Sequence, residues 1–256
     1  MKRISLEEAK YLQYEMLKEI HRYTESHSLT YFLSAGTLLG AVRHQGFIPW
    51  DDDIDIIMPQ PDFEKLMREY ISDRYETVWC YNNLEYEYPF GRLYDKRTYT
   101  KIGRHQGLGI FIDIYVIFGA PMTKVEQEAR FHNAFRHIFL RRFLIRLRSG
   151  LANRGLWPMK TLNCRWINQL TREIYEGLSV CNYTDSDYIH PYGGGKHIVK
   201  KSLYEKKILM KFCDNLFYVP ACYDELLRIT YGDYMQLPPQ EARHPYHITG
   251  DFYWKK

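Results

Sequence analysis

Residues 51–58, DDDIDIIM, join a group of four aspartates to an apolar run, and this junction restricts the folds open to the chain. Alternate residues of a strand point to the same face of the sheet. We therefore expect Asp53 and Asp55 to project together, with Asp51 able to join them, while Ile54 and Ile56 face a core. The alternative is that the first three acids form a polar loop and a helix cap, with Asp55 on an exposed edge.

The segment before these acids has the pattern of a strand, a glycine turn and a short helix. Tyr31–Ala35 is apolar and β-prone, Gly36 interrupts it, and Thr37–Val42 has the composition of a helix. The first N–H groups of a helix have no partner within the helix, so they form a small anion site. This order predicts a phosphate-binding turn directly upstream of the carboxylates.

Carboxylates that share one face of a strand need a positive partner. Two of them ~4 Å apart repel by about 4 kcal/mol at an effective dielectric constant of 20. A proton, an arginine or lysine, or a divalent cation can offset this repulsion. Rigid oxygen ligands suit Mg²⁺ or Mn²⁺, which also bind substrate phosphates. The predicted turn and the acids together indicate a site for phosphoryl transfer.

A second informative segment is Gly109–Phe118, GIFIDIYVIF, whose β-branched and aromatic residues predict a buried central strand. Its single acid, Asp113, cannot lie ionised and unpaired in apolar surroundings. Either it belongs to a buried hydrogen-bond network or it faces a cation. Because Asp53 and Asp55 also need a cation, we expect Asp113 to complete their cluster from a neighbouring strand.

The composition is that of an ordinary globular protein, with 256 residues of which 45% are hydrophobic and 26% charged. A net charge of +4 suits an anionic substrate but is too small to indicate nucleic acid. The five cysteines include no Cys-x-x-Cys pair, which argues against a disulfide framework or a zinc site. Because the first residues lack a signal-like pattern and no run approaches ~18 apolar residues, we expect a cytoplasmic protein.

Local patterns place several further elements. A capping box at Ser5 opens a helix that should extend to about His27, and Pro61 opens another helix. Residues 75–81 and 90–95 have the pattern of strands. This region carries four cations that are candidates for phosphate ligands, or else solvated residues of a sheet edge: Arg92, Lys96, Arg97 and Lys101.

The chain changes character near Pro121. We predict a catalytic core at 1–120 and a mainly helical region at 121–256 that packs on it, the two forming one structural unit. Residues 126–148 predict a helix rich in arginine and aromatic residues. This helix either packs on the core with its arginines in solvent or contacts anionic lipid.

The last third of the chain contains its most loop-like stretch, residues 185–200. The GGGK sequence at 193–196 lacks the spacing of a phosphate loop, so it predicts a surface loop or a lid. A strand at 212–219 and a helix at 221–230 should follow. We expect the tail at 231–247 to return to the predicted site.

Four segments resemble the LicD family of phosphocholine-transferase-like proteins, which is related to the fukutin-type phosphoalditol transferases. They are GTLLGAVRH at 36–44, IPWDDDID at 48–55, GIFIDIY at 109–115 and YGDYMQLPP at 231–239. The resemblance spans most of the chain, and its first block is specific. It implies an α+β fold of the nucleotidyltransferase type, with a mixed β-sheet flanked by helices and a mainly helical C-terminal half.

The resemblance also implies a reaction. The donor would be CDP-choline or another CDP-alcohol, the cofactor Mg²⁺ or Mn²⁺, and the leaving group CMP. The acceptor would be a hydroxyl of a glycan or lipid-linked glycan, of the teichoic acid or lipopolysaccharide type, with peripheral contact of the helix at 126–148 with the inner face of the membrane. Two alternatives use the same carboxylates: an enzyme that transfers a nucleotide monophosphate and releases pyrophosphate, and a non-catalytic nucleotide-binding module.

On this interpretation Asp53, Asp55 and Asp113 hold the metal and carry the catalysis, and Asp113 also accepts the proton of the acceptor hydroxyl. Arg43 acts as a charge clamp, because a guanidinium matches phosphate with two parallel hydrogen bonds. Its alternative is a surface ion pair with Asp51 or Asp52. The residues predicted to bind substrate or nucleotide are Gly36, Thr37, Arg43, Lys96 and Asp51.

Overall fold

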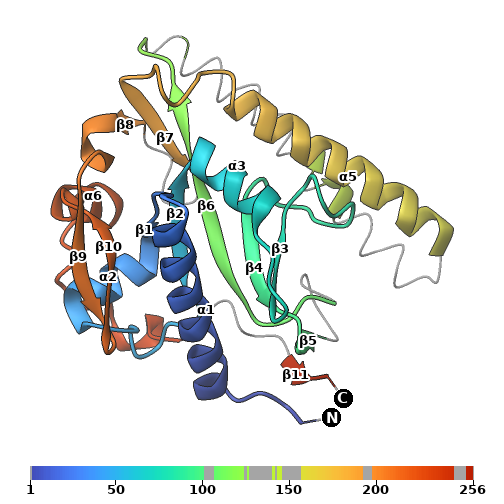
Figure 1. Cartoon of the computed structure of the whole chain (residues 1–256), viewed down its shortest axis with the longest axis horizontal. Coiled ribbons are helices and arrows are strands. Elements are labelled where there is room, and N and C mark those ends of the chain that lie inside the picture. Colours follow the sequence, from blue (N-terminus) through green and yellow to red (C-terminus); the bar gives the residue numbers. More distant parts are fainter. Residues whose placement is uncertain are drawn as a thin grey trace.

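The fold is a mixed β-sheet with helices on its faces and at its edges (Figure 1). The computed structural model describes residues 2–100, 107–123, 126, 140–141, 143–145, 157–192, 198–244 and 252–255, the side chains of 157–163 excepted. This architecture confirms the predicted α+β class, in which a mixed sheet is flanked by helices.

The sheet is built around its longest strand, which pairs on both of its edges. Its seven strands are β1 (Phe32–Leu33), β2 (Asp55–Pro59), β6 (Phe111–Ala120), β4 (Gly91–Asp95), β3 (Tyr75–Val78), β7 (Tyr188–Tyr192) and β8 (Val199–Lys200). Strand β2 runs parallel to β6 along one edge, and every other pair is antiparallel. On the other edge of β6, β4 pairs with the first half and β7 with the second half.

Two helices cover one face of this sheet. Helix α1 (Leu6–Ser26) begins at Ser5, whose hydroxyl accepts the Glu8 N–H as the capping box predicts. Helix α3 (Gln60–Glu69) has proline in its first turn, also as predicted. Both helices contact β6, and Figure 1 shows α1 crossing the sheet.

The two faces of β2 belong to different hydrophobic clusters. Ile54, Ile56 and Met58 lie in the main core beneath α1 and α3. Ile57 lies in a second cluster on the opposite face. The predicted alternation is therefore confirmed: Ile54 and Ile56 face the core, and Asp55 between them faces the other side of the sheet.

The edge of the sheet at β1 and the second face are covered by different elements. Helix α2 (Ala35–His44) contacts β2 and the hairpin of β9 (Lys207–Phe212) and β10 (Asn215–Pro220), and β10 contacts β1. The buried side chains of α2 and of this hairpin belong to the main core. The second cluster includes side chains from the 3-10 helix η1 (Lys201–Tyr204) and from α6 (Tyr223–Tyr231). The remaining elements are α5 (Trp157–Leu178), η2 (Gln240–Ala242), β5 (Thr98–Thr100) and β11 (Phe252–Trp254).

Strands accompany the helices of the C-terminal region. Residues 185–200, predicted as a loop, contain β7, which pairs with β6, and β8, which pairs with β7. The loop prediction followed Pro191 and the glycines at 193–195, although Tyr188, Ile189 and Val199 are strand formers. Strand β7 thereby places a segment from after Pro121 in the same sheet as the strands that precede Pro121. Residues 193–197 and most of 126–148 lie outside the described residues, and with them lie the predicted lid, Lys101 and the predicted lipid-binding helix.

The described ends of the chain lie side by side (Figure 1). Strand β11 pairs with β5, and the backbone of Arg3 forms a bridge with that of Tyr253. Among the helices that the structure describes, none is both long and apolar enough to span a membrane.

Candidate metal and substrate site

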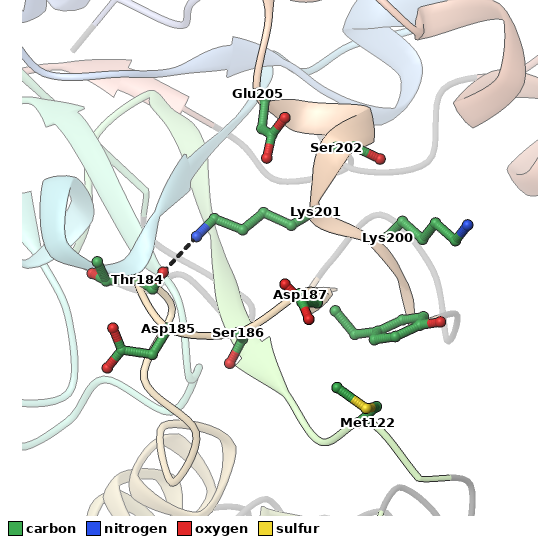
Figure 2. Close-up of a pocket in the computed structure, with 10 residues that line it drawn as sticks. Met122, Thr184, Asp185, Ser186, Asp187, Lys200, Lys201, Ser202 and Glu205 are labelled. Carbon is green, nitrogen blue, oxygen red and sulfur yellow. Dashed lines mark hydrogen bonds between the residues drawn. The ribbon is translucent and has the colours of Figure 1, made fainter.

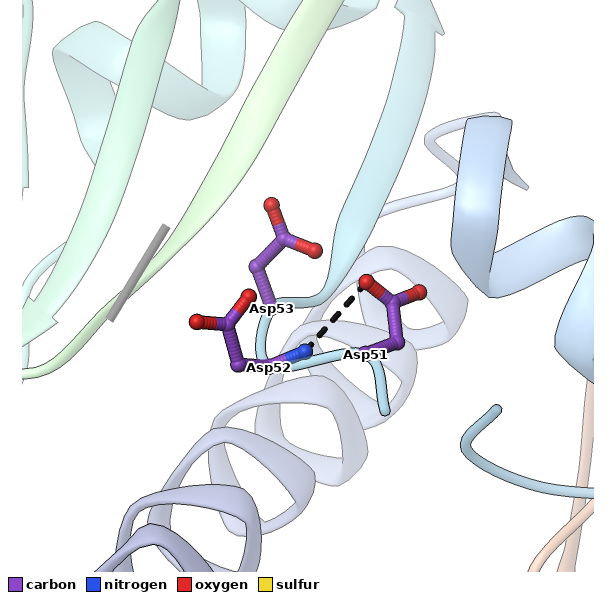
Figure 3. Close-up of side chains that lie close together, drawn as sticks. All are labelled: Asp51, Asp52 and Asp53. Carbon is purple, nitrogen blue, oxygen red and sulfur yellow. Dashed lines mark hydrogen bonds between the residues drawn. The ribbon is translucent and has the colours of Figure 1, made fainter. Parts of the chain in front are cut away.

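Three consecutive aspartates lie together in the loop that leads into β2. Oxygens of Asp51, Asp52 and Asp53 lie within 4.8 Å of one another (Figure 3). Asp52 and Asp53 are buried, and Asp51 is half-buried. The Asp51 carboxylate accepts the Asp52 N–H at 3.3 Å, which orders the loop. Such a set of carboxylate oxygens has the chemistry that Mg²⁺ or Mn²⁺ prefers.

A charged row crosses the sheet beside this loop. Asp55 on β2 lies opposite Asp113 on β6, and Asp113 lies opposite Arg92 on β4. Directly opposed residues share a face, so all three side chains lie on the face away from α1 and α3. Arg92 Nε donates to Asp113 Oδ1 at 2.5 Å, and both side chains are buried. We call Asp55, Asp113 and Arg92 the charged row.

The structure therefore brings the predicted Asp53, Asp55 and Asp113 to one region of one face. It also supplies a partner that the predicted set did not include: the cation that pairs with Asp113 in the structure is the Arg92 guanidinium. The sequence contained Arg92 as one of four cations near this strand. Only the antiparallel register of β4 and β6 distinguishes it from the others.

Negative charge exceeds positive charge at this place. Burial raises the pKa of Asp55 well above its usual range, and Asp53 and Asp113 add to the shift, while Arg92 opposes it. Asp55 Oδ1 is buried and accepts no hydrogen bond from the described residues. A buried carboxylate oxygen without a donor is costly unless a cation approaches it. The donor set and this oxygen therefore fit a divalent cation.

The start of α2 packs against the same acids. Thr37 Oγ1 accepts the Asp55 N–H at 2.8 Å. Ser34 is the N-cap of α2, and its side chain makes no capping hydrogen bond. Ala35 has a φ of 45°, in the left-handed region that favours glycine. The predicted Gly36 and Thr37 thus lie beside the carboxylates, at the positive end of a helix.

Gly36 offers a direct test of this packing, because an added Cβ would lie 2.5 Å from Asp51 Oδ2. Replacing Gly36 with alanine should displace the Asp51 carboxylate and weaken Mg²⁺ or Mn²⁺ binding by roughly tenfold, the scale of changes next to metal ligands. Calorimetric titration with Mn²⁺ measures this. Gly177→Ala in α5 is the control, since its Cβ would meet nothing within 4 Å. Equal affinities of the two variants would contradict the arrangement.

The tail of the chain also reaches this region, as predicted. Arg43 Nη1 donates to the Tyr234 carbonyl at 2.8 Å, and Arg43 forms no ion pair with Asp51 or Asp52 within the described structure. The pKa of Tyr231 is raised first by burial and then by Asp55 and its neighbours. Its hydroxyl is therefore within electrostatic reach of the acids.

Lys96, which was predicted to bind substrate, does not lie beside the carboxylates. Its Nζ donates to the Ser72 carbonyl at 2.8 Å. It follows the end of β4, and about 3.4 Å per strand residue places it more than ~10 Å from Arg92 along the strand. The sequence indicated a cation near the site but not the direction in which β4 runs.

Gln13 was not identified from the sequence, although it connects two parts of the site. Its buried Nε2 donates to the carbonyls of Asp52 and Phe111, at 3.2 and 3.1 Å. The carbonyl of Asp52 belongs to the loop of Asp51, Asp52 and Asp53, which we call the acidic loop. The carbonyl of Phe111 lies at the start of β6. Helix α1 thereby fixes the loop relative to the strand that carries Asp113.

The acids predict a characteristic pH dependence. Burial, and then Asp53, raise the pKa of Asp51 to about 7, so between its ordinary pKa of 3.8 and about 7 the folded chain holds a proton that the unfolded chain has released. The free energy of unfolding should therefore decline as pH rises through this window in the absence of divalent cations. Melting temperatures in EDTA at pH 5 and pH 8 measure the decline.

Asp51→Asn is the matched variant for this experiment, and it should show a smaller decline than the unmodified chain. Added Mg²⁺ should raise the melting temperature more at pH 8 than at pH 5, because carboxylates bind metal when deprotonated. A larger effect of Mg²⁺ at pH 5 would contradict a carboxylate site.

A separate cavity of about 490 Å³ lies beyond the far end of β6 (Figure 2). It is lined by Met122, the segment Thr184–Tyr188 and Lys200–Ser202 with Glu205. Lys201 Nζ donates to the Thr184 carbonyl at 2.8 Å, so this lysine links two segments that line the cavity. Asp113 lies at the other end of the strand, so the cavity is distinct from the acidic site.

Comparison with known proteins matches the same region. Residues 28–149 match the family described as LicD/FKTN/FKRP, nucleotidyltransferase domain. A lipopolysaccharide cholinephosphotransferase LicD of Haemophilus influenzae is 28% identical over 271 aligned positions, which cover 97% of this chain and 98% of that protein. An uncharacterized protein of Rickettsia typhi is 39% identical over 74 residues, 27% of this chain and 24% of that protein. The matched range contains the acidic loop and the charged row, so this part of the chain is similar to the nucleotidyltransferase domain of the LicD family.

Proposed function

We propose that this chain transfers a phospho-alcohol group, phosphocholine in particular, from a CDP-linked donor to a hydroxyl of a cell-surface glycan precursor. The single observation that carries the proposal is the buried group of carboxylates at the start of α2, with an Asp55 oxygen that lacks a donor. The similarity to a lipopolysaccharide cholinephosphotransferase along nearly the whole chain supports this substrate class.

Asp51, Asp53 and Asp55 are the residues that we propose to hold Mg²⁺ or Mn²⁺, with Asp113 beside them. When bound there, such an ion would neutralise charge on the diphosphate of the donor. The chain's own contribution is positioning. Gln13 and Thr37 fix the backbone of the acidic loop and of β2, so the carboxylates are oriented before substrate arrives.

The remaining groups act on phosphate and on the proton. The free N–H groups at the start of α2 point to an anion site beside the acids. Arg43 lies in the last turn of the same helix, where its guanidinium donates to the Tyr234 carbonyl, and we assign it to the donor phosphates as a charge clamp. We assign to Asp113, which is held in place by Arg92, the acceptance of the proton of the attacking hydroxyl.

The bonds balance as follows. The acceptor oxygen attacks the phosphorus that carries choline, the bond from this phosphorus to the bridging oxygen breaks, and CMP leaves with that oxygen. In the alternative nucleotidyltransferase reaction the attacked phosphorus is the one that carries the nucleoside, and its bond to the bridging oxygen breaks. The nucleotide then ends on the acceptor, and the leaving group is phosphocholine from CDP-choline or pyrophosphate from a nucleoside triphosphate.

Donor labelled at either phosphorus separates these reactions. Purified chain with Mg²⁺, CDP-choline and a lipopolysaccharide acceptor should move the choline-linked label to the glycan and release the other label as CMP. Transfer of the nucleoside-linked label would establish the alternative. If no CDP-alcohol yields CMP with any glycan, a non-catalytic nucleotide-binding role replaces the proposal.

We also propose a cytoplasmic location with peripheral contact at the membrane, since a lipid-linked acceptor would be presented there. The basic composition of residues 126–148 supports this contact. Co-sedimentation with vesicles should increase with anionic lipid, and sedimentation that is independent of lipid charge would exclude it.

A further inference from the structure

An aromatic row lies one strand step beyond the charged row, on the same face of the sheet. Tyr115 follows Asp113 by two residues on β6 and lies opposite Ile57 on β2. Phe90, directly before β4, meets Tyr115 from the other side, with ring centroids 4.8 Å apart. The two rows therefore run parallel, about 7 Å apart along the strands.

A third ring extends this row. Tyr88 and Phe90 have centroids 5.1 Å apart. Tyr88, Phe90 and Tyr115, which we call the aromatic patch, are each partly exposed, unlike Tyr86, which is buried. Aromatic rings left accessible beside buried carboxylates are available to a ligand that combines apolar surface with positive charge.

The patch already accommodates a cation on its inner side. The Arg92 guanidinium lies 4.6 Å from the Tyr88 ring centroid and 5.7 Å from that of Phe90. Because Asp113 pairs with Arg92, this guanidinium does not add an uncompensated charge. The three carboxylates at 51, 53 and 55 together carry more charge than one divalent cation offsets. The surroundings of the patch therefore stay negative with Mg²⁺ bound, which favours a second cation over an anion.

A quaternary ammonium group fits these surroundings better than the other head groups of CDP-alcohols. Its methyl groups cannot donate conventional hydrogen bonds, so it is recognised by ring faces and by nearby negative charge. A primary ammonium or a polyol needs more hydrogen-bond partners than three ring faces and two tyrosine hydroxyls provide. In phosphocholine only an oxygen and two carbons separate phosphorus from nitrogen. A phosphate near the charged row would therefore place the nitrogen near the aromatic patch.

We propose that Tyr88, Phe90 and Tyr115 form the head-group subsite of the donor and select a quaternary ammonium over ethanolamine, glycerol or ribitol. This inference rests on the proposed function, since it assigns part of the same site to the donor alcohol. It makes these residues binding residues that determine specificity.

Calorimetric titration in the presence of Mg²⁺ tests it with CDP, CDP-choline, CDP-ethanolamine and CDP-glycerol, and with phosphocholine alone. The unmodified chain should bind CDP-choline about tenfold more tightly than CDP-ethanolamine, as expected for a partly desolvated cation–π contact. Tyr88→Leu and Tyr115→Leu should remove this difference and leave the affinity for CDP unchanged. Tyr115→Phe, which keeps the ring, should retain the preference.

Tyr11→Leu is the matched control, because Tyr11 is 61% exposed on α1, and this variant should retain the preference for CDP-choline. Tyr88 lies outside the strands, so its variant keeps the test valid if Tyr115→Leu fails to fold. Equal binding of all four CDP compounds by the unmodified chain would overturn the inference while the proposed function stands. Binding of phosphocholine through the patch without any binding of CDP compounds would support the subsite and overturn the proposed donor.

Discussion

Asparagine in place of Asp53 or Asp55 should leave the chain folded but lower the rate of CMP release by at least about a thousandfold, the scale of losing a principal electrostatic contributor to catalysis. Each change replaces a carboxylate that we propose as a metal ligand with a neutral amide. It also removes repulsion, since Asp55 is buried among other carboxylates. The melting temperature of each variant in EDTA should therefore equal or exceed that of the unmodified chain.

Asp73→Asn is the control for this pair, because Asp73 is an exposed aspartate outside the acidic site. It should change neither the rate nor the melting temperature. Steady-state assays with CDP-choline, together with Mn²⁺ titration, separate loss of metal from loss of fold. An Asp55→Asn enzyme that retained both Mn²⁺ affinity and turnover would refute the role assigned to Asp55.

Methionine in place of Arg92 should lower the free energy of unfolding by about 3–5 kcal/mol, because it leaves the buried Asp113 carboxylate without its ion-pair partner. Asp113→Asn should also destabilise the chain, since it strands a buried guanidinium. Urea denaturation of both variants measures the effect.

The double variant Arg92→Met with Asp113→Asn completes the cycle. If the two side chains act as a pair, its destabilisation should be clearly smaller than the sum of the single changes. Arg22→Met is the comparison, because Arg22 pairs with Glu19 on the exposed surface of α1 and its loss should change stability little. Additive effects at positions 92 and 113 would show that the ion pair contributes no coupling.

Much of the site was predictable because strand periodicity depends on neighbouring residues alone. The alternation of Ile54, Asp55 and Ile56 fixed which side chains face the core, and the apolar run around Asp113 indicated a buried acid in need of a partner. The capping box at Ser5 likewise acts within one turn, and the structure contains it. Local physical rules of this kind can be read from one sequence.

The parts that could not be predicted depend on pairing between distant segments. Arg92 and Lys96 have similar sequence surroundings, and only the register of β4 against β6 places the first beside Asp113 and directs the second to Ser72. Gln13 is a polar residue on an otherwise unremarkable helix until its amide is seen to bridge two backbone carbonyls. Strand β7 was missed because Pro191 and the glycines that follow it are local loop signals, while its pairing with β6 joins segments some seventy residues apart.

The pairing of β7 with β6 limits how the polypeptide can be divided. A fragment that ended at Ala120 would leave the outer side of Val116–Ala120 as an open edge, with backbone N–H and C=O groups that β7 otherwise occupies. Such an edge on an apolar strand readily recruits a second chain, so the fragment should self-associate. The acidic loop and the charged row lie wholly before residue 121, yet their scaffold requires a strand supplied some seventy residues later.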